Sequence, residues 1–152
     1  MSERPLAYLI DAHYQIFRAY HSLPDLRAPD GRPIGAVRGY ASTLIKFLRE
    51  HRPTHVVAAF DFALTCFRNE LYADYKRGRT EAPEDLEPQF ALCEAVTRAL
   101  GISVHRVEGY EADDVLATLV PGLLEAGSEI AIVTRDKDLG ALVAERVWLL
   151  DL

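Results

Sequence analysis

Five short apolar runs, separated by longer stretches with helical periodicity, constrain the fold of this chain more than any other feature. The runs span residues 6–10, 55–60, 102–107, 129–133 and 146–150, and each is typical of a β-strand. The helical stretches span residues 34–50, 83–100 and 112–126, with a short one at 139–143. Apolar strands that alternate with helices form parallel sheets covered on both faces. The sequence therefore predicts an α/β fold, a three-layer sandwich around a mostly parallel five-stranded sheet.

Glycine and proline support the predicted helix boundaries. Gly101 and Gly127 stand just after predicted helices and just before predicted strands, where C-caps are expected. Pro121 falls inside the third long helix and should bend it or mark where it weakens.

Two segments lack either periodicity. Residues 22–33 are rich in Pro, Asp and Gly and are predicted to be a loop. Residues 62–83, called the 62–83 connection below, include the basic run of residues 76–79 (KRGR). A connection of about 20 residues inside a compact domain is usually functional or mobile.

The length and composition indicate one globular domain rather than a disordered, fibrous or membrane protein. The chain has 152 residues, of which 49% are hydrophobic and 26% are charged. No run approaches the roughly 20 apolar residues of a membrane span, and the amino terminus lacks the pattern of a secretory signal. Cys66 and Cys93 are far apart and are expected to be reduced thiols. We therefore expect a cytoplasmic protein.

The net charge of −6 conceals an asymmetry between the two halves of the chain. Residues 1–80 contain 12 Lys and Arg against 8 Asp and Glu, whereas residues 81–152 contain 5 against 15. One interpretation is that the acids hold cations and the bases hold an anionic substrate. Uneven solvated faces explain the same charges equally well.

Acidic residues follow four of the five predicted strands. Because the carboxyl ends of parallel strands meet at one edge of the sheet, seven carboxylates are predicted to converge there. They are Asp11, Asp61, Glu111, Asp113, Asp114, Asp136 and Asp138. Such a cluster needs cations, and ligands that are all oxygens favour Mg²⁺ or Mn²⁺ over zinc. The alternative for each acid alone is a structural one, because acids also cap turns and favour the first turn of a helix.

A carboxylate-rich site with divalent metals most often acts on phosphate esters. The sequence contains no phosphate-binding Gly-x-x-x-x-Gly-Lys loop, no Gly-x-Gly-x-x-Gly fingerprint and no Gly-x-Ser-x-Gly elbow. Phosphodiester hydrolysis is the reaction that fits these acids best.

Seven motifs, in order along almost the whole chain, resemble the 5'-3' exonuclease/flap endonuclease family. The closest form is the amino-terminal nuclease domain of bacterial DNA polymerases. The motifs are residues 9–13 (LIDAH), 17–21 (FRAYH), 67–68 (FR), 74–79 (DYKRGR), 83–86 (PEDL), 109–119 (GYEADDVLATL) and 134–139 (TRDKDL).

The resemblance implies a PIN-like fold in which the 62–83 connection forms a helical arch for DNA with a free single-stranded 5' end or flap. It assigns the seven acids to the metal positions, with Mg²⁺ or Mn²⁺ bound as two ions. Lys76 and Arg79 would stabilise charge on the scissile phosphate, and Arg68, Tyr75 and Arg77 would bind substrate. An ordinary solvated charge run, or packing for Tyr75, remains the alternative. His13 and His21 are expected to pack or to contact substrate, and Trp148 to lie in the core.

The sequence departs from the family pattern at two places. Apolar residues 62–66 (FALTC) follow Asp61, where the family has small or basic residues. The family's helix–three-turn–helix element, which grips duplex DNA and adds ligands to the second metal, would follow Leu152. We therefore expect an incomplete second metal site, and either a fragment of a longer replication or repair nuclease or a minimal relative. The alternatives are a small PIN-type ribonuclease and a non-catalytic remnant that binds nucleic acid or a partner protein.

Overall fold

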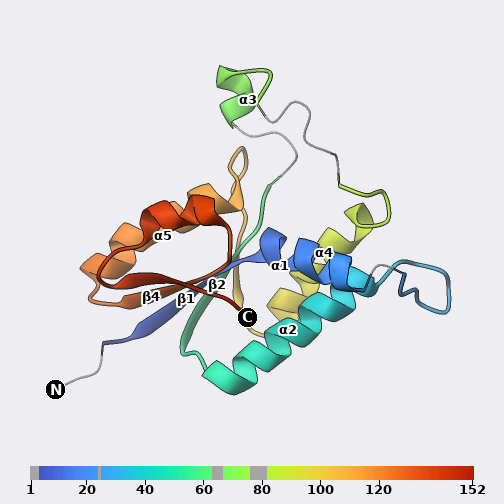
Figure 1. Cartoon of the computed structure of the whole chain (residues 1–152), viewed down its shortest axis with the longest axis horizontal. Coiled ribbons are helices and arrows are strands. Elements are labelled where there is room, and N and C mark those ends of the chain that lie inside the picture. The colour runs from blue at the N-terminus through green and yellow to red at the C-terminus, as the bar shows by residue number, and fades with distance from the viewer. Residues whose placement is uncertain (1–3, 24, 63–66, 76–81) are drawn as a thin grey trace.

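The computed structural model describes residues 4–23, 25–62, 67–75 and 82–152. Its sheet contains only parallel pairs among these residues, in the order β3-β2-β1-β4-β5 (Figure 1). The strands are β1 (Leu6–Asp11), β2 (His55–Ala59), β3 (Ser103–His105), β4 (Glu129–Val133) and β5 (Val147–Leu150). The predicted parallel five-stranded sheet is therefore confirmed, with β3 shorter than expected at one edge.

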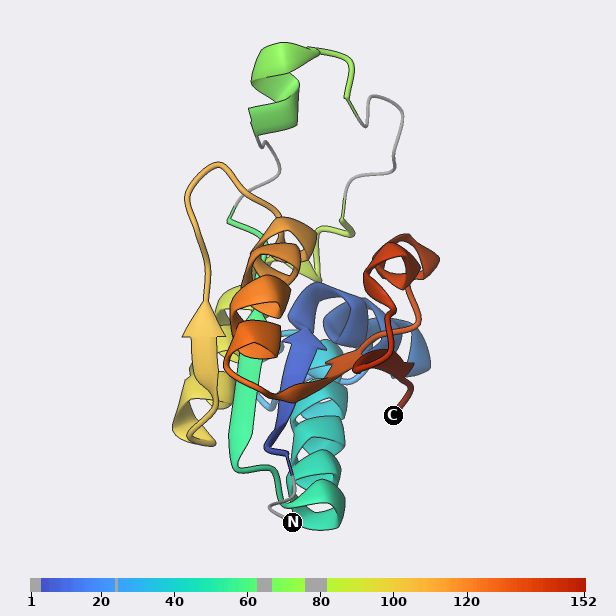
Figure 2. The same cartoon turned by 90° about the vertical axis from the view of Figure 1, so that its left-hand side faces the viewer.

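Alternate residues of the central strands face two separate cores. Tyr8 and Ile10 of β1 pack with Ala131 and Val133 of β4 under α1 (Ala12–Ser22), α2 (Gly35–His51) and α4 (Glu87–Ala99). Leu9 of β1 instead packs in the second core, under α5 (Ala112–Glu125) and the 3-10 helix η1 (Lys137–Leu142). Figure 2 shows the sheet between these two helical layers. The predicted three-layer sandwich follows from this alternation.

Helix α1 has no counterpart among the predicted elements. It begins directly after β1, and Asp11 serves as its N-cap by accepting a hydrogen bond from the Tyr14 N–H at 3.2 Å. Its buried residues are Ala12, Gln15, Ile16 and Ala19, the spacing of one helical face. The apolar spacing could have predicted this helix from the sequence. It was missed because no turn residue separates the helix from the strand before it.

The predicted carboxyl ends of α2, α4 and α5 agree with the structure to within one residue. Gly101 and Gly127 have φ values of 79° and 86°, which confirms both C-cap predictions. Helix α5 continues past Pro121 to Glu125. Helix α4 begins at Glu87 rather than at Pro83, because the Pro83 carbonyl accepts the N–H groups of Leu86 and Glu87 in a turn.

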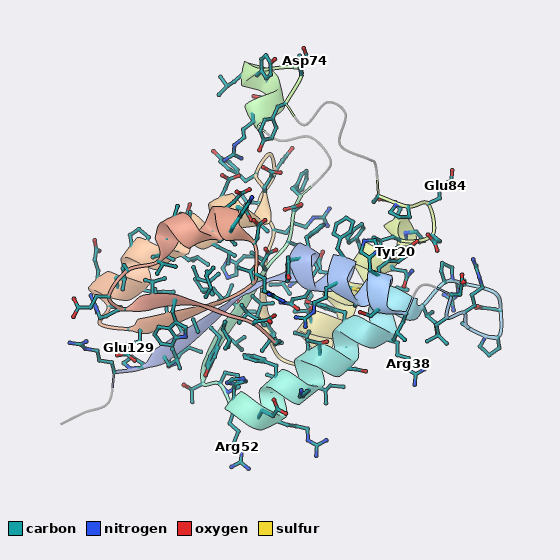
Figure 3. The ribbon with its side chains drawn as sticks, in the orientation of Figure 1. Tyr20, Arg38, Arg52, Asp74, Glu84 and Glu129 are labelled. Carbon is teal, nitrogen blue, oxygen red and sulfur yellow. The ribbon has the colours of Figure 1, made fainter. Side chains whose placement is uncertain are left out.

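The loop prediction for 22–33 is confirmed for residues 23 and 25–33, where the chain turns back through a bridge between Arg27 and Pro33, whereas Ser22 still belongs to α1. Within the described residues of the 62–83 connection there is one short helix, α3 (Phe67–Leu71), which stands beyond the carboxyl ends of the strands (Figures 1 and 2). Asp74 lies beside α3, at the end away from the sheet (Figure 3). In the described part of the chain, no helix is long and apolar enough to cross a membrane.

Candidate active site

A cavity of about 270 Å³ opens at the carboxyl edge of the sheet. Six of the seven predicted acids line it, together with three aromatic residues and one histidine. The lining residues are Asp11, His13, Tyr14, Phe17, Asp61, Tyr75, Glu111, Asp113, Asp136 and Asp138. The strand ends thus bring these acids together as the parallel topology requires, and Asp114 is the predicted acid outside the lining.

Asp11 is the deepest of these acids, with only 4% of its surface exposed. The pKa of Asp11 is raised from 3.8 to about 7, mainly by burial and to a smaller extent by the negative charges of Asp113 and Asp61. Hydrogen bonds from the Tyr14 N–H and the Thr134 hydroxyl oppose the rise. Asp11 is therefore a carboxylate that gains from a cation nearby.

Thr134, which the sequence analysis did not single out, joins two strand ends beneath the cavity. Its hydroxyl donates to Asp11 Oδ2 at 3.1 Å and accepts the N–H of Asp136 at 3.0 Å. Asp136 Oδ1 in turn accepts the N–H of Asp138 at 2.9 Å and caps η1. A Thr directly after a buried strand could have indicated a residue of the site. Its contact with Asp11 could not be predicted, because it depends on β1 and β4 being neighbours in the sheet.

Asp61 lines the cavity from the segment that follows β2. Its Oδ1 accepts the N–H of Ala112 at the start of α5 at 2.7 Å, and its own N–H donates to His13 Nδ1 at 3.2 Å. His13 Nε2 lies 4.0 Å from Asp61 Oδ2, and the ring stacks on Phe90 with centroids 4.7 Å apart. His13 therefore combines the expected packing role with a place at the cavity. Its Nδ1 is an acceptor, so in the neutral ring the proton is on Nε2.

The amino end of α5 carries the remaining acids. Glu111 and Asp113 line the cavity, whereas Asp114 accepts two hydrogen bonds from Arg68 of the 62–83 connection. Arg68 Nη1 also donates to Glu111 Oε2 at 3.1 Å, and the Tyr75 hydroxyl donates to the same oxygen at 3.3 Å. Two of the predicted substrate-binding residues thus contact acids. Lys76, Arg77 and Arg79 lie outside the described residues.

Several acids have the structural role that was the alternative to metal binding. Asp11 and Asp136 cap helices, and Asp61 accepts an N–H at the start of another. These bonds fix the carboxylates at the cavity, so capping and convergence occur together at this edge of the sheet.

The donor set fits a hard cation. The cavity is lined by carboxylate oxygens, the ligands that Mg²⁺ and Mn²⁺ prefer. Within the described residues, no three His, Cys, Asp or Glu side chains are close enough together to hold one ion by themselves. Mg²⁺ usually retains several waters and binds one or two carboxylates directly, so a hydrated ion suits an open ring of acids better than a tight cage.

Trp148, expected in the core, is 37% exposed on the edge strand β5. The prediction of a core position for Trp148 is therefore wrong, because one face of an edge strand is open to solvent. Cys93 lies on the buried face of α4, and burial raises the pKa of its thiol to about 12.

Two solved structures from bacteriophage T5 have the same fold. The 5'-exonuclease with bound zinc aligns with a TM-score of 0.72 and 18% identity, over 97% of this chain and 55% of that chain. A flap endonuclease in complex with DNA and metal ions aligns with a TM-score of 0.70 and 17% identity, over the same shares. The PIN-like fold implied by the resemblance is therefore confirmed.

Curated relatives are DNA polymerases that this chain matches over a short part of their length. DNA polymerase I of Rhizobium leguminosarum is 43% identical over 152 residues, which covers 95% of this chain and 15% of the relative. The thermostable DNA polymerase I of Thermus aquaticus is 41% identical over 142 residues, which covers 93% and 17%. The family model for the 5'-3' exonuclease N-terminal resolvase-like domain matches residues 6–152. With that match across nearly its whole length, the chain belongs to the 5'-3' exonuclease N-terminal domain family.

Proposed function

We propose that this chain is a divalent-metal-dependent 5'-3' exonuclease and 5'-flap endonuclease that hydrolyses phosphodiester bonds of DNA in replication or repair. The observation that carries the proposal is the ring of six carboxylates around one cavity at the carboxyl edge of the sheet. Family membership supports it, and so do the metal ions and the DNA named for the bacteriophage T5 structures.

The proposed metal ligands are the acids that line the cavity, acting directly or through water. They are Asp11, Asp61, Glu111, Asp113, Asp136 and Asp138. A bound Mg²⁺ or Mn²⁺ would supply Lewis acidity and a water of lowered pKa for attack on phosphorus. A second ion, bound at a site whose ligand set is incomplete in this chain, is part of this proposal.

The chain's own residues have separate tasks in the proposal. The bonds from Thr134 and from the Ala112 N–H hold Asp11 and Asp61 in place. Lys76 and Arg79 are proposed to stabilise negative charge on the scissile phosphate, and Arg77 to contact the DNA backbone. Tyr75, which lines the cavity, is proposed to stack on an unpaired base when DNA enters.

The test is a cleavage assay on 5'-labelled flap DNA, single-stranded DNA and single-stranded RNA, each with Mg²⁺, Mn²⁺ or EDTA. Release of labelled product from both DNA substrates with either metal, and none with EDTA, is the expected result. Preferred cleavage of RNA would favour the PIN-type ribonuclease, and binding without cleavage would favour a non-catalytic domain. Cleavage that continues in EDTA would contradict metal dependence. Asp136→Asn serves as the inactive control, because asparagine retains the capping oxygen and loses the charge.

A further inference from the structure

Arg68 and Asp114 join the 62–83 connection to α5 through a two-point ion pair. Arg68 Nη2 lies 2.6 Å from Asp114 Oδ1, and Nη1 lies 2.9 Å from Asp114 Oδ2. The side chains are 32% and 17% exposed, so water screens the pair only in part. A guanidinium that meets both oxygens of one carboxylate is among the strongest and most directional of side-chain contacts.

The carboxylate of Asp114 has further bonds that leave it little capacity for another ligand. Its Oδ2 also accepts the N–H of Glu111 at 3.0 Å, which closes the first turn of α5. Three hydrogen bonds therefore use three of its roughly four lone-pair positions. Its negative charge is matched by a cation, and it does not line the cavity.

Helical geometry explains why neighbouring acids have different surroundings. Successive residues of an α-helix point about 100° apart, so Asp113 and Asp114 cannot face the same way. Asp113 lines the cavity, whereas Asp114 meets the connection.

Among the side chains that the structure describes at α3, the large apolar ones are exposed. Leu71 is 82% exposed and Tyr72 is 64% exposed. In the described part of the connection, Arg68 bonds Asp114 of α5 and its N-cap residue Glu111, and Tyr75 bonds Glu111. The Arg68 guanidinium also lies over the Tyr75 ring, 5.7 Å from its centroid. These polar contacts therefore hold α3 near the cavity.

We propose that Asp114 is a positioning residue that, paired with Arg68, holds residues 67–75 of the connection beside the cavity, and that it is not a metal ligand. Arg68 acts in this proposal on Asp114 rather than on the DNA backbone. The proposal rests on the proposed function, because it takes the cavity to be the metal and DNA site. The ion pair and its effect on the connection can be tested without any catalysis.

The experiment compares Asp114→Asn with Asp138→Asn in the full 152-residue chain. Each change removes one negative charge from the same edge of the sheet. Asparagine at position 114 retains an oxygen for the Glu111 N–H. Asp138 lines the cavity, and its carboxylate has no hydrogen bond or ion pair with other residues of the described chain, so it is the matched control. Arg68→Gln, Arg68→Lys and the Arg68→Gln/Asp114→Asn double variant complete the set.

The first measurement is amide hydrogen exchange of residues 67–75 in EDTA, read by mass spectrometry. Asp114→Asn and Arg68→Gln should each speed exchange several-fold, the double variant should add nothing, and Arg68→Lys should restore part of the protection. Asp138→Asn should leave exchange in this peptide unchanged. Wild-type exchange in Asp114→Asn would overturn the proposal, even if the chain proves to have no nuclease activity.

The second measurement is Mn²⁺ binding by calorimetry. Asp138→Asn should weaken Mn²⁺ affinity by roughly tenfold or more, whereas the double variant, which has the wild-type net charge, should stay within about twofold. An equal loss of affinity in the double variant would make Asp114 a metal ligand and overturn the proposal. If wild type binds no Mn²⁺, the proposed function fails while hydrogen exchange still decides the anchor.

The third measurement is cleavage of flap DNA at a saturating metal concentration. The double variant should have the same kcat/KM as Arg68→Gln alone, because Asp114 acts in this proposal only through Arg68. If Arg68 instead contacts DNA independently of Asp114, the losses of the two single variants will multiply.

Discussion

The sheet body and the 62–83 connection are held by different forces, although both contribute side chains to one cavity. In the body, Leu9, Ile10 and Ile132 are fully buried, and the acids follow directly from strands that these residues fix in place. In the connection, Leu71 is exposed, and Arg68 and Tyr75 reach the body through polar contacts with acids. The body can therefore present carboxylates at a fixed edge, and the connection depends on charge to stay near them.

This difference predicts different responses to mutation and pH. Changes in the body should alter the free energy of unfolding strongly, because they disturb close packing or a buried charge. Changes on the exposed side of the connection should alter it little.

The largest expected effect comes from the charge of Asp11. Its pKa is about 7 in the folded protein against 3.8 when unperturbed, so the folded state holds the proton more tightly. The tighter binding of this proton stabilises the folded state. The stabilisation is fully present below about pH 4 and is lost as the pH rises through about 7. A three-unit shift corresponds to roughly 4 kcal/mol. In EDTA, Asp11→Asn should therefore unfold at a higher temperature than wild type at pH 8, and the difference should shrink toward pH 5.

Denaturant unfolding of wild type and of Asp11→Asn at several pH values measures this effect. Asparagine can accept the Tyr14 N–H at its amide oxygen and donate its amide N–H to the Thr134 oxygen, so both contacts can form without the negative charge. A variant less stable than wild type at pH 8 would mean that the hydrogen bonds to the Asp11 carboxylate outweigh its burial.

The next effect tests close packing in the body. A Cβ on Gly35 would lie 1.9 Å from the Leu23 carbonyl oxygen, so the backbone would have to move. Gly35→Ala should lower the free energy of unfolding by roughly 3 kcal/mol, measured by urea unfolding.

Gly122→Ala is the matched control, because a Cβ there meets no atom within 4 Å and the residue lies inside α5. It should stabilise the chain by up to about 1 kcal/mol through helix propensity. Equal effects of the two alanines would show that the α1–α2 contact does not constrain the body.

The smallest effect is expected in the connection. Leu71 is 82% exposed, so Leu71→Ala should change the free energy of unfolding by less than about 0.5 kcal/mol. Urea unfolding that shows a loss of 2 kcal/mol or more would mean that α3 packs on the body in solution and that the two regions are not held differently.

The sheet body could be predicted from the sequence better than the contacts of the 62–83 connection could. Strand β4 matches its predicted span, and the six cavity acids lie at the predicted edge, because apolar periodicity and parallel topology determine both. Helix α1 was missed although its apolar spacing is regular, because it follows β1 without a turn residue.

The pairing of Arg68 with Asp114 could not be predicted in the same way. The two residues are 46 positions apart, and the connection has no periodicity that fixes its register against α5. Nothing in the order of residues distinguishes Asp113, which lines the cavity, from Asp114, which does not. Only the direction of each side chain on the folded helix separates them.

The central claim is that acids fixed by the body form a divalent metal site, and thermal melting with and without metal tests it most directly. At a hundredfold excess over the dissociation constant, Mn²⁺ should stabilise wild type by about 2.7 kcal/mol and raise the Tm by roughly 5–10 °C over EDTA. Asp136→Asn, which retains the cap on η1, should melt above wild type in EDTA and gain less from Mn²⁺. A wild-type Tm that is the same in Mn²⁺, Mg²⁺ and EDTA would contradict the metal site and the nuclease proposal built on it.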